Sequence, residues 1–111
     1  MKDQIRGKIV ETAKGRGTIN YEEVGKLGNL SMANPDHRNQ LANMLDDINR
    51  EEDRKGGPML SVVVVKKDSR RPGKGFFELA RELGRQAPDV DDETFFVTEL
   101  KRVYEYCRST G

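Results

Sequence analysis

The fold is decided by residues 56–83, which read GGPMLSVVVVKKDSRRPGKGFFELAREL. This stretch contains the longest apolar run of the chain, its densest basic cluster and the start of a helix. Four consecutive valines are stiff at χ1 and favour an extended backbone, so residues 59–66 are predicted to form a β-strand. Because apolar and polar residues do not alternate, we expect this strand to be buried on both faces near its middle.

A basic loop follows the predicted strand. Residues 66–74 contain five basic residues and one acid, and Pro72-Gly73 marks a turn. A helix is predicted to begin near Gly75, so its first N–H groups and the loop cations could hold a phosphate together. The alternative is a solvated loop whose charges only increase solubility. The loop residues predicted to bind nucleic acid are Lys66, Lys67, Arg70, Arg71, Gly73, Lys74 and Gly75.

Three helices are predicted before the strand. Residues 2–14 have apolar side chains at helical spacing. A short helix starts after Asn20, which is followed three residues later by Glu23 in a capping-box arrangement. The third helix opens with Asn34 and Pro35 and is the most clearly amphipathic. Its predicted buried face carries Leu41, Met44, Leu45 and Ile48, and its predicted exposed face carries Asp46, Asp47, Glu51 and Glu52.

Two further helices are predicted after the basic loop. The first is short, begins near Gly75 and is marked by Phe76, Phe77, Ala80 and Leu83. The pairs Phe76-Phe77 and Phe95-Phe96 are expected in the core, with the alternative that one residue of each pair is exposed and marks a protein interface. The second is capped by Asp91 or Asp92. Its predicted buried stripe consists of Phe96, Leu100, Val103, Tyr104 and Cys107.

Three helices followed by a strand and a basic loop are the element order of a winged helix-turn-helix. We therefore predict one domain over residues 1–111, of the α+β class but mostly helical, with an added C-terminal helix. The third helix would be the reader, and its first turn carries side chains that can hydrogen-bond base edges. Any exposed first turn also carries polar residues, and the later acids of this helix would repel phosphate. The reader residues are His37, Arg38, Asn39 and Gln40.

The overall charge does not favour nucleic acid by itself. Lysine and arginine number 20 against 19 acidic residues, which gives a net charge of +1. Binding would have to come from local segregation of charge. The single cysteine excludes an internal disulfide, and we see neither a signal-peptide core nor a run long enough to span a membrane. We expect a cytoplasmic protein of a bacterium or a phage, with no membrane partner.

Catalysis is not expected. The single histidine and the single cysteine fall in different predicted helices, and no acid pair has a metal-ligand partner at a diagnostic spacing. Gly75 follows Gly73-Lys74, where a phosphate-binding loop of nucleotide hydrolases needs Ser or Thr. Val64 stands where a nuclease of the Asp then Glu-x-Lys type needs an acid. We predict no cofactor and no metal.

Residues 18–76 resemble the DNA-binding winged-helix half of the alkylguanine-DNA alkyltransferases and alkyltransferase-like proteins. Tyr21 matches the tyrosine of that family's Tyr-Gly-x-x-Ala helix, although Glu22 and Gly25 replace its glycine and alanine. Pro58 matches the first proline of the reactive-site strand, and Pro72, Gly73 and Gly75 echo its glycine-rich turn. The resemblance implies a winged-helix fold and a DNA-binding role that includes Tyr21. It argues against alkyl transfer, because residues 62–65 are valines where the family has its reactive Cys-His-Arg. The strings PMLSVVVVKK and PGKGFFELA are also similar to short proteins of bacteria and phages, which implies no activity.

These observations favour a non-enzymatic winged-helix protein that binds nucleic acid, with duplex DNA as the favoured partner. Such a protein would act as a regulator or as part of a bacterial or phage defence or counter-defence system, and it could form a homodimer. The alternative is a protein-interaction module, such as a phage inhibitor or an accessory subunit. A third reading is an enzyme fragment that needs a partner. A continuous basic face joining Arg38 to residues 66–74 would favour nucleic acid, whereas a mixed face with exposed phenylalanines would favour a protein.

Overall fold

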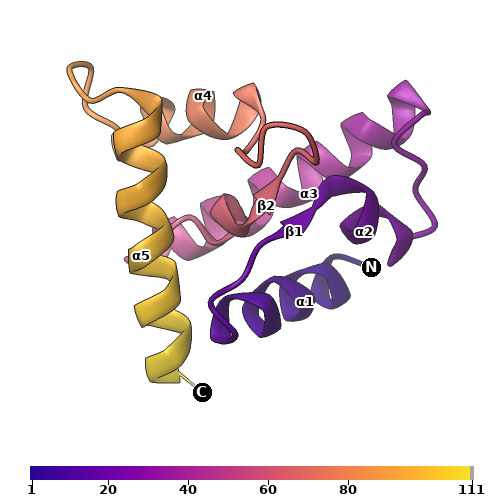
Figure 1. Cartoon of the computed structure of the whole chain (residues 1–111), viewed down its shortest axis with the longest axis horizontal. Coiled ribbons are helices and arrows are strands. Elements are labelled where there is room, and N and C mark those ends of the chain that lie inside the picture. The colour runs from indigo at the N-terminus through magenta and orange to yellow at the C-terminus, as the bar shows by residue number, and fades with distance from the viewer. Residues whose placement is uncertain (111) are drawn as a thin grey trace.

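The computed structural model describes residues 1–110. Within them the protein is mostly helical, with a small two-stranded sheet near its centre (Figure 1). In chain order the elements are α1 (Lys2–Lys14), β1 (Ile19–Asn20), α2 (Tyr21–Lys26), α3 (Pro35–Arg54), the 3-10 helix η1 (Leu60–Val63), β2 (Val64–Val65), α4 (Lys74–Glu82) and α5 (Asp92–Thr110). No helix in this part of the chain is both long enough and apolar enough to cross a membrane.

The predicted helix starts are confirmed, because local capping residues fix them. The Asn20 Oδ1 atom accepts a hydrogen bond from the Glu23 N–H at 2.9 Å, and its Nδ2 donates to the Glu23 carboxylate at 2.8 Å. Asn34 caps α3 in the same way by accepting from the Asp36 N–H at 2.9 Å. The carboxylate of Asp91 accepts from the first turn of α5. Each cap satisfies an N–H group that has no partner inside its helix.

The strand predicted over residues 59–66 is wrong for most of its length. Leu60–Val63 forms a 3-10 helix, and only Val64–Val65 is a strand. This strand pairs in parallel with β1, and Ile19 lies opposite Val64. The predicted burial is confirmed, since the four valines are at most 3% exposed.

Side chains of the long helices replace a neighbouring strand along this buried segment. The Met59 N–H donates to the Glu99 carboxylate of α5 at 2.8 Å. The Ser61 N–H donates to Asn49 Oδ1 of α3 at 3.0 Å, and Asn49 Nδ2 donates to Ser61 Oγ at 2.7 Å. Buried backbone donors need such partners. The segment therefore turns instead of extending, in spite of the β propensity of its valines.

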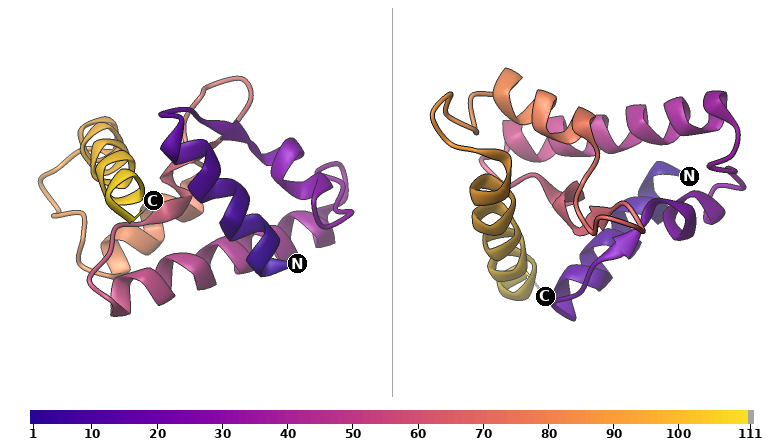
Figure 2. Two further views of the ribbon diagram at one scale, coloured as in Figure 1. Left: turned by 90° about the horizontal axis from the view of Figure 1, so that it is seen from below. Right: turned by 45° about the horizontal axis from the view of Figure 1, so that its top comes forward.

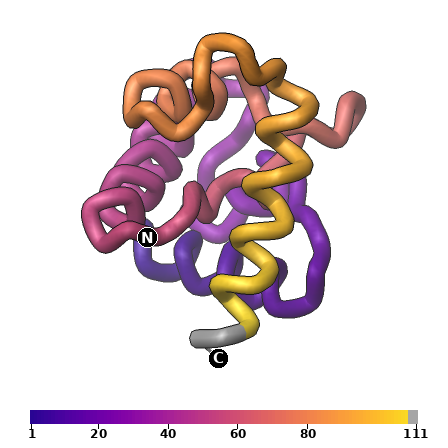
Figure 3. The backbone as a smooth tube through the Cα atoms, turned by 90° about the vertical axis from the view of Figure 1, so that its left-hand side faces the viewer, coloured from indigo at the N-terminus to yellow at the C-terminus, as the bar shows by residue number. Residues whose placement is uncertain are grey.

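The basic loop that follows β2 has no returning strand. The chain runs from β2 through residues 66–73 directly into α4, and the loop projects from the body (Figure 3). Its own backbone closes it: the Lys66 N–H donates to the Arg71 carbonyl at 2.8 Å, and the Arg70 N–H donates to the Lys66 carbonyl at 2.9 Å. Arg70 has a left-handed backbone, with φ of 57°.

The hydrophobic core lies around the 3-10 helix, between α1, α3 and α5 (Figure 2). All four phenylalanines are buried, and none is more than 7% exposed. The stripe predicted for α3 is buried at Leu41, Leu45 and Ile48, and Met44 is half-buried. On α5, Phe96, Val103 and Cys107 are buried, whereas Leu100 and Tyr104 are half-buried.

Two acids lie inside this core. Glu52, predicted on the exposed face of α3, is instead fully buried, as is Glu99 of α5. Glu52 accepts hydrogen bonds from the Arg6 guanidinium and, at 2.9 Å, from the Tyr106 hydroxyl. The prediction for Glu52 failed because its partners come from distant helices. Its carboxylate joins α1, α3 and α5.

Candidate nucleic-acid interface

A cavity of about 530 Å³ opens between α2, α3, the basic loop and the start of α4. Its wall is largely apolar and includes Met32, Leu41, Leu45 and Phe76. Several of the residues predicted to bind nucleic acid line this cavity, although they come from distant parts of the sequence. These residues are Tyr21, Arg38, Lys66, Lys67, Gly73 and Gly75.

Tyr21 anchors the loop to α2. Its hydroxyl accepts a hydrogen bond from the Gly73 N–H at 2.8 Å. Burial raises the pKa of Tyr21, partly offset by this backbone bond, so the phenol stays protonated at neutral pH. A side chain larger than hydrogen at Gly73 would crowd this hydroxyl, because a Cβ there would lie 3.3 Å from the oxygen. Tyr21 thus fixes the end of the loop.

Arg71 anchors the other side of the loop to α5. Its guanidinium makes two hydrogen bonds to the Glu93 carboxylate, both of 2.6 Å. The same guanidinium lies 4.9 Å from the centre of the Phe96 ring. A bidentate, stacked arginine of this kind is held in one geometry. Arg71 was predicted to grip phosphate, but the structure places it in a contact between the loop and α5.

The other loop cations are exposed and unpaired. Lys66, Lys67, Arg70 and Lys74 make no ion pair with the part of the chain that the structure describes. Their charges are therefore available to an anionic partner. They sit on a loop that Tyr21 and Arg71 hold at both sides.

The N-terminus of α4 adds donors to the same place. Gly73 is its N-cap and has no side chain to accept a hydrogen bond, and the first turn carries no acid. The N–H groups at the start of this helix were predicted to face an anion, but those of Gly73 and Phe76 are already used by Tyr21 and by the Gly73 carbonyl. The first-turn N–H groups of Lys74 and Gly75 remain, and α4 is long enough to polarise them.

The first turn of α3 is partly engaged in holding the chain that precedes it. His37 Nδ1 accepts from the Ser31 N–H at 2.9 Å, and Arg38 Nη1 donates to the Met32 carbonyl at 2.9 Å. The remaining reader residues, Asn39 and Gln40, are exposed and do not line the cavity. Arg38 is the only one of the four that the structure brings to the cavity.

Three acids also stand at the cavity and were missed from the sequence. The carboxylate of Asp68 accepts from the Ser69 N–H at 2.7 Å, and Glu22 lies in the first turn of α2, where the helix dipole favours an acid. Burial raises the pKa of Asp46, partly offset by Arg50. Of the three, Asp68 has a hydrogen-bond partner, and Lys66 and Lys67 make no ion pair within residues 1–110.

The apolar wall was also missed, and the sequence offered one weak signal for it. Met32 is a large apolar residue in the connection between α2 and α3, but Leu27 and Leu30 lie in the same connection, so the signal does not single it out. It lies between the cavity and a second hollow, of about 590 Å³, along α2 and residues 29–33. No pattern of spacing predicts that this connection faces the basic loop.

Comparisons with protein-family models, curated proteins and solved structures found no match for this chain. Within residues 1–110 there is also no group of three or more His, Cys, Asp or Glu side chains that could hold a metal ion. What this surface binds therefore has to be inferred from its own residues.

Proposed function

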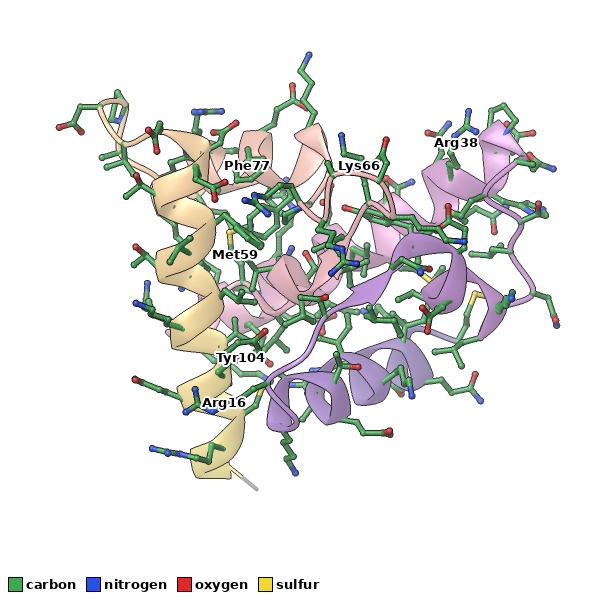
Figure 4. All side chains as sticks on the ribbon, viewed as in Figure 1. Arg16, Arg38, Met59, Lys66, Phe77 and Tyr104 are labelled. Atoms are coloured by element: carbon green, nitrogen blue, oxygen red, sulfur yellow. The ribbon has the colours of Figure 1, made fainter. Side chains whose placement is uncertain are left out.

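We propose that this protein binds nucleic acid, with duplex DNA as the favoured partner, through the exposed cations of the basic loop and Arg38. The observation that carries this proposal is that Arg38, Lys66 and Lys67, from distant parts of the sequence, line one cavity. Arg38 and Lys66 lie toward the same side of the molecule (Figure 4). A chain with a net charge of only +1 needs local segregation of this kind to attract phosphate.

A winged-helix mode of binding is part of the proposal. In it α2 and α3 act as the helix-turn-helix, and the basic loop alone acts as the wing. The loop grips phosphates, which gives affinity without sequence selectivity. Arg38, Asn39 and Gln40 approach the base edges, and the acids farther along α3 limit the approach to this first turn. We assign no catalytic step and place the protein among regulators or defence and counter-defence components.

A protein partner is the second candidate, and the rim acids favour it. Glu22, Asp46 and Asp68 make the rim mixed in charge. A protein surface carrying both signs would complement such a rim. The phenylalanines count against this candidate, because all four are buried and none is exposed to anchor a partner.

The test compares two triple variants with the same change in net charge. The first replaces Lys67, Arg70 and Lys74 with alanine. The control replaces three exposed cations of α1 and α5, Lys14, Lys101 and Arg108. Binding of a labelled duplex and of the matching single strand is followed by fluorescence anisotropy over a range of salt concentrations.

The loop variant should bind every duplex sequence more weakly than the parent. Each neutralised phosphate contributes about 0.9 to the slope of log affinity against log salt, so three lost contacts should flatten this slope by roughly two to three units. The control variant should keep the parental slope. Equal losses in both variants would show a general charge effect and would remove the loop from the proposal. A parent that binds no nucleic acid at low salt would refute the proposal and leave a protein partner as the function.

A further inference from the structure

The cavity inside the basic surface is not needed for gripping phosphates, which a flat patch of lysines does equally well. Its volume of about 530 Å³ falls within the range of roughly 300–1,000 Å³ that is typical of small-molecule sites. Met32, Leu41, Leu45 and Phe76 present apolar surface to it. Covering such surface with an apolar group is favourable, because it releases the water in contact with it.

Charged side chains of both signs line the cavity, with Arg38, Lys66 and Lys67 on one hand and Glu22, Asp46 and Asp68 on the other. Lys66 and Lys67 are adjacent, exposed and make no ion pair within the described chain. Gly73 and Gly75, at the start of α4 where no side chain caps the helix, line the same cavity. The side of the cavity formed by the two lysines and this helix start therefore suits an anionic group.

We propose that this cavity binds one free, small organic anion with an apolar body. The apolar body lies against Leu45 and Phe76, and the anionic group lies at the mouth near Lys66 and Lys67. The Tyr21 hydroxyl, which accepts from the Gly73 N–H, still has its own proton to donate to the ligand. This activity goes beyond nucleic-acid binding. It also links the two, because a ligand at Lys66 and Lys67 competes with phosphate for the same charges.

Simple alkyl carboxylates test both halves of the ligand by isothermal titration calorimetry, with no nucleic acid present. Octanoate should bind more tightly than hexanoate, by about fourfold for each added methylene. This factor corresponds to the gain of about 0.8 kcal/mol in binding free energy when one methylene is buried. Octanamide has nearly the same apolar body but no charge, and it should bind on the order of tenfold more weakly than octanoate.

Two tryptophan variants locate the ligand. Ala42 lines the cavity from α3 and is exposed enough to accept a larger side chain, so Ala42→Trp should fill the cavity and reduce octanoate binding at least tenfold. Asn43→Trp is the matched control, because Asn43 is the next residue of α3, is exposed and does not line the cavity. Urea unfolding of both variants shows whether either one has lost its fold.

Two lysine variants test the anionic group without altering the core. The double variant Lys66→Gln and Lys67→Gln should weaken octanoate on the order of tenfold and leave octanamide unchanged. Lys74→Gln should leave octanoate binding unchanged, because Lys74 does not line the cavity, although it should weaken nucleic-acid binding.

The inference is overturned if the parent shows no saturable binding of octanoate, or if the two tryptophan variants bind it equally well. It is also overturned if the double lysine variant binds octanoate and octanamide more weakly than the parent by the same factor. A parent that binds octanoate but no nucleic acid would support the cavity and refute only the proposed function.

Discussion

Replacing Glu52 with alanine should be among the most damaging single changes in this protein. The Glu52 carboxylate is fully buried and is contacted by Arg6 of α1 and by the Tyr106 hydroxyl of α5 at 2.9 Å. Its removal leaves both donors without their acceptor and opens a hole between three helices. Breaking a buried ion pair in this way costs about 3–5 kcal/mol.

The structure places the expected cost at the lower end of that range. The Arg6 side chain is 36% exposed, so its charge can reach water after the change, whereas that of Glu52 is not exposed at all. We expect Glu52→Ala to lower the free energy of unfolding by about 3 kcal/mol, a large part of the roughly 5–15 kcal/mol that holds a domain of this size together. Urea denaturation followed by circular dichroism measures this, provided that the denaturant slope is unchanged.

The neighbouring acid supplies a matched control. Glu51 pairs with Lys2 at 2.5 Å, but both side chains are more than a third exposed. Exposed pairs contribute little to stability, because water and salt screen them, so Glu51→Ala should lower the urea midpoint far less than Glu52→Ala does. If Glu52→Ala costs no more than Glu51→Ala, the buried network has been misread.

The acid dependence of stability gives an independent reading of the same carboxylate. Burial acts to raise the pKa of Glu52, but the hydrogen bonds from Arg6 and Tyr106 and the nearby cations outweigh it, so the pKa lies below its ordinary value of 4.5. The unfolded chain therefore binds this proton more readily than the folded one. The stabilisation is complete above about pH 4.5 and is lost as the pH falls through the lowered pKa. Glu52→Gln, which cannot titrate, should flatten the loss of stability in acid. An unchanged acid profile would contradict the assignment.

Two further predictions follow from the packing and from the loop. Leu45→Ala removes a side chain that is 5% exposed and should lower the free energy of unfolding by about 2–5 kcal/mol; an unchanged urea midpoint would show that α3 packs through another face. Arg71→Ala breaks the contact with Glu93 and Phe96, so it should weaken duplex binding severalfold by loosening the loop while leaving the salt slope nearly unchanged. A fall of about 0.9 in that slope would instead make Arg71 a phosphate contact.

The helix boundaries could be predicted because their causes are local. Asn20, Asn34 and Asp91 cap helices within three residues of themselves, so a short window of sequence contains all the interacting groups. The same locality explains the stripe of α3, where helical spacing alone sets which side chains share a face.

The central segment could not be predicted because its partners lie far away in the chain. Four valines favour a strand, but the N–H groups of Met59 and Ser61 bond to Glu99 and Asn49. A strand exists only where another strand accepts its hydrogen bonds, and β1 offers just Ile19–Asn20. Tertiary contacts therefore override the propensity of this segment.

The buried acids could have been found from the sequence by register. Glu52 lies four residues after Ile48 and so continues the apolar stripe of α3. Glu99 likewise falls between Phe96 and Val103 on the stripe of α5. An acid in register with a buried stripe needs a buried partner. Assigning Glu52 to the solvated face of α3 ignored that spacing.

The cations of the candidate site could be predicted from the sequence. Which of them are left to bind a ligand could not. Five cations in nine positions are visible in the sequence, but nothing there separates Arg71, which is fixed to Glu93, from Lys67, which makes no ion pair in the described part of the chain. The separation depends on where α5 passes the loop. Only the folded chain determines that.

The two loop contacts also explain how a short, polar loop can act as a binding element. A loop that is ordered only on binding loses affinity, because fixing each residue costs about 1–2 kcal/mol. Here Tyr21 holds Gly73 against α2, and Arg71 is held against α5. Glu52 and Glu99 in turn hold α5 against α3 and the 3-10 helix. The loop is therefore ordered when the protein folds, and its exposed lysines meet a ligand without that cost.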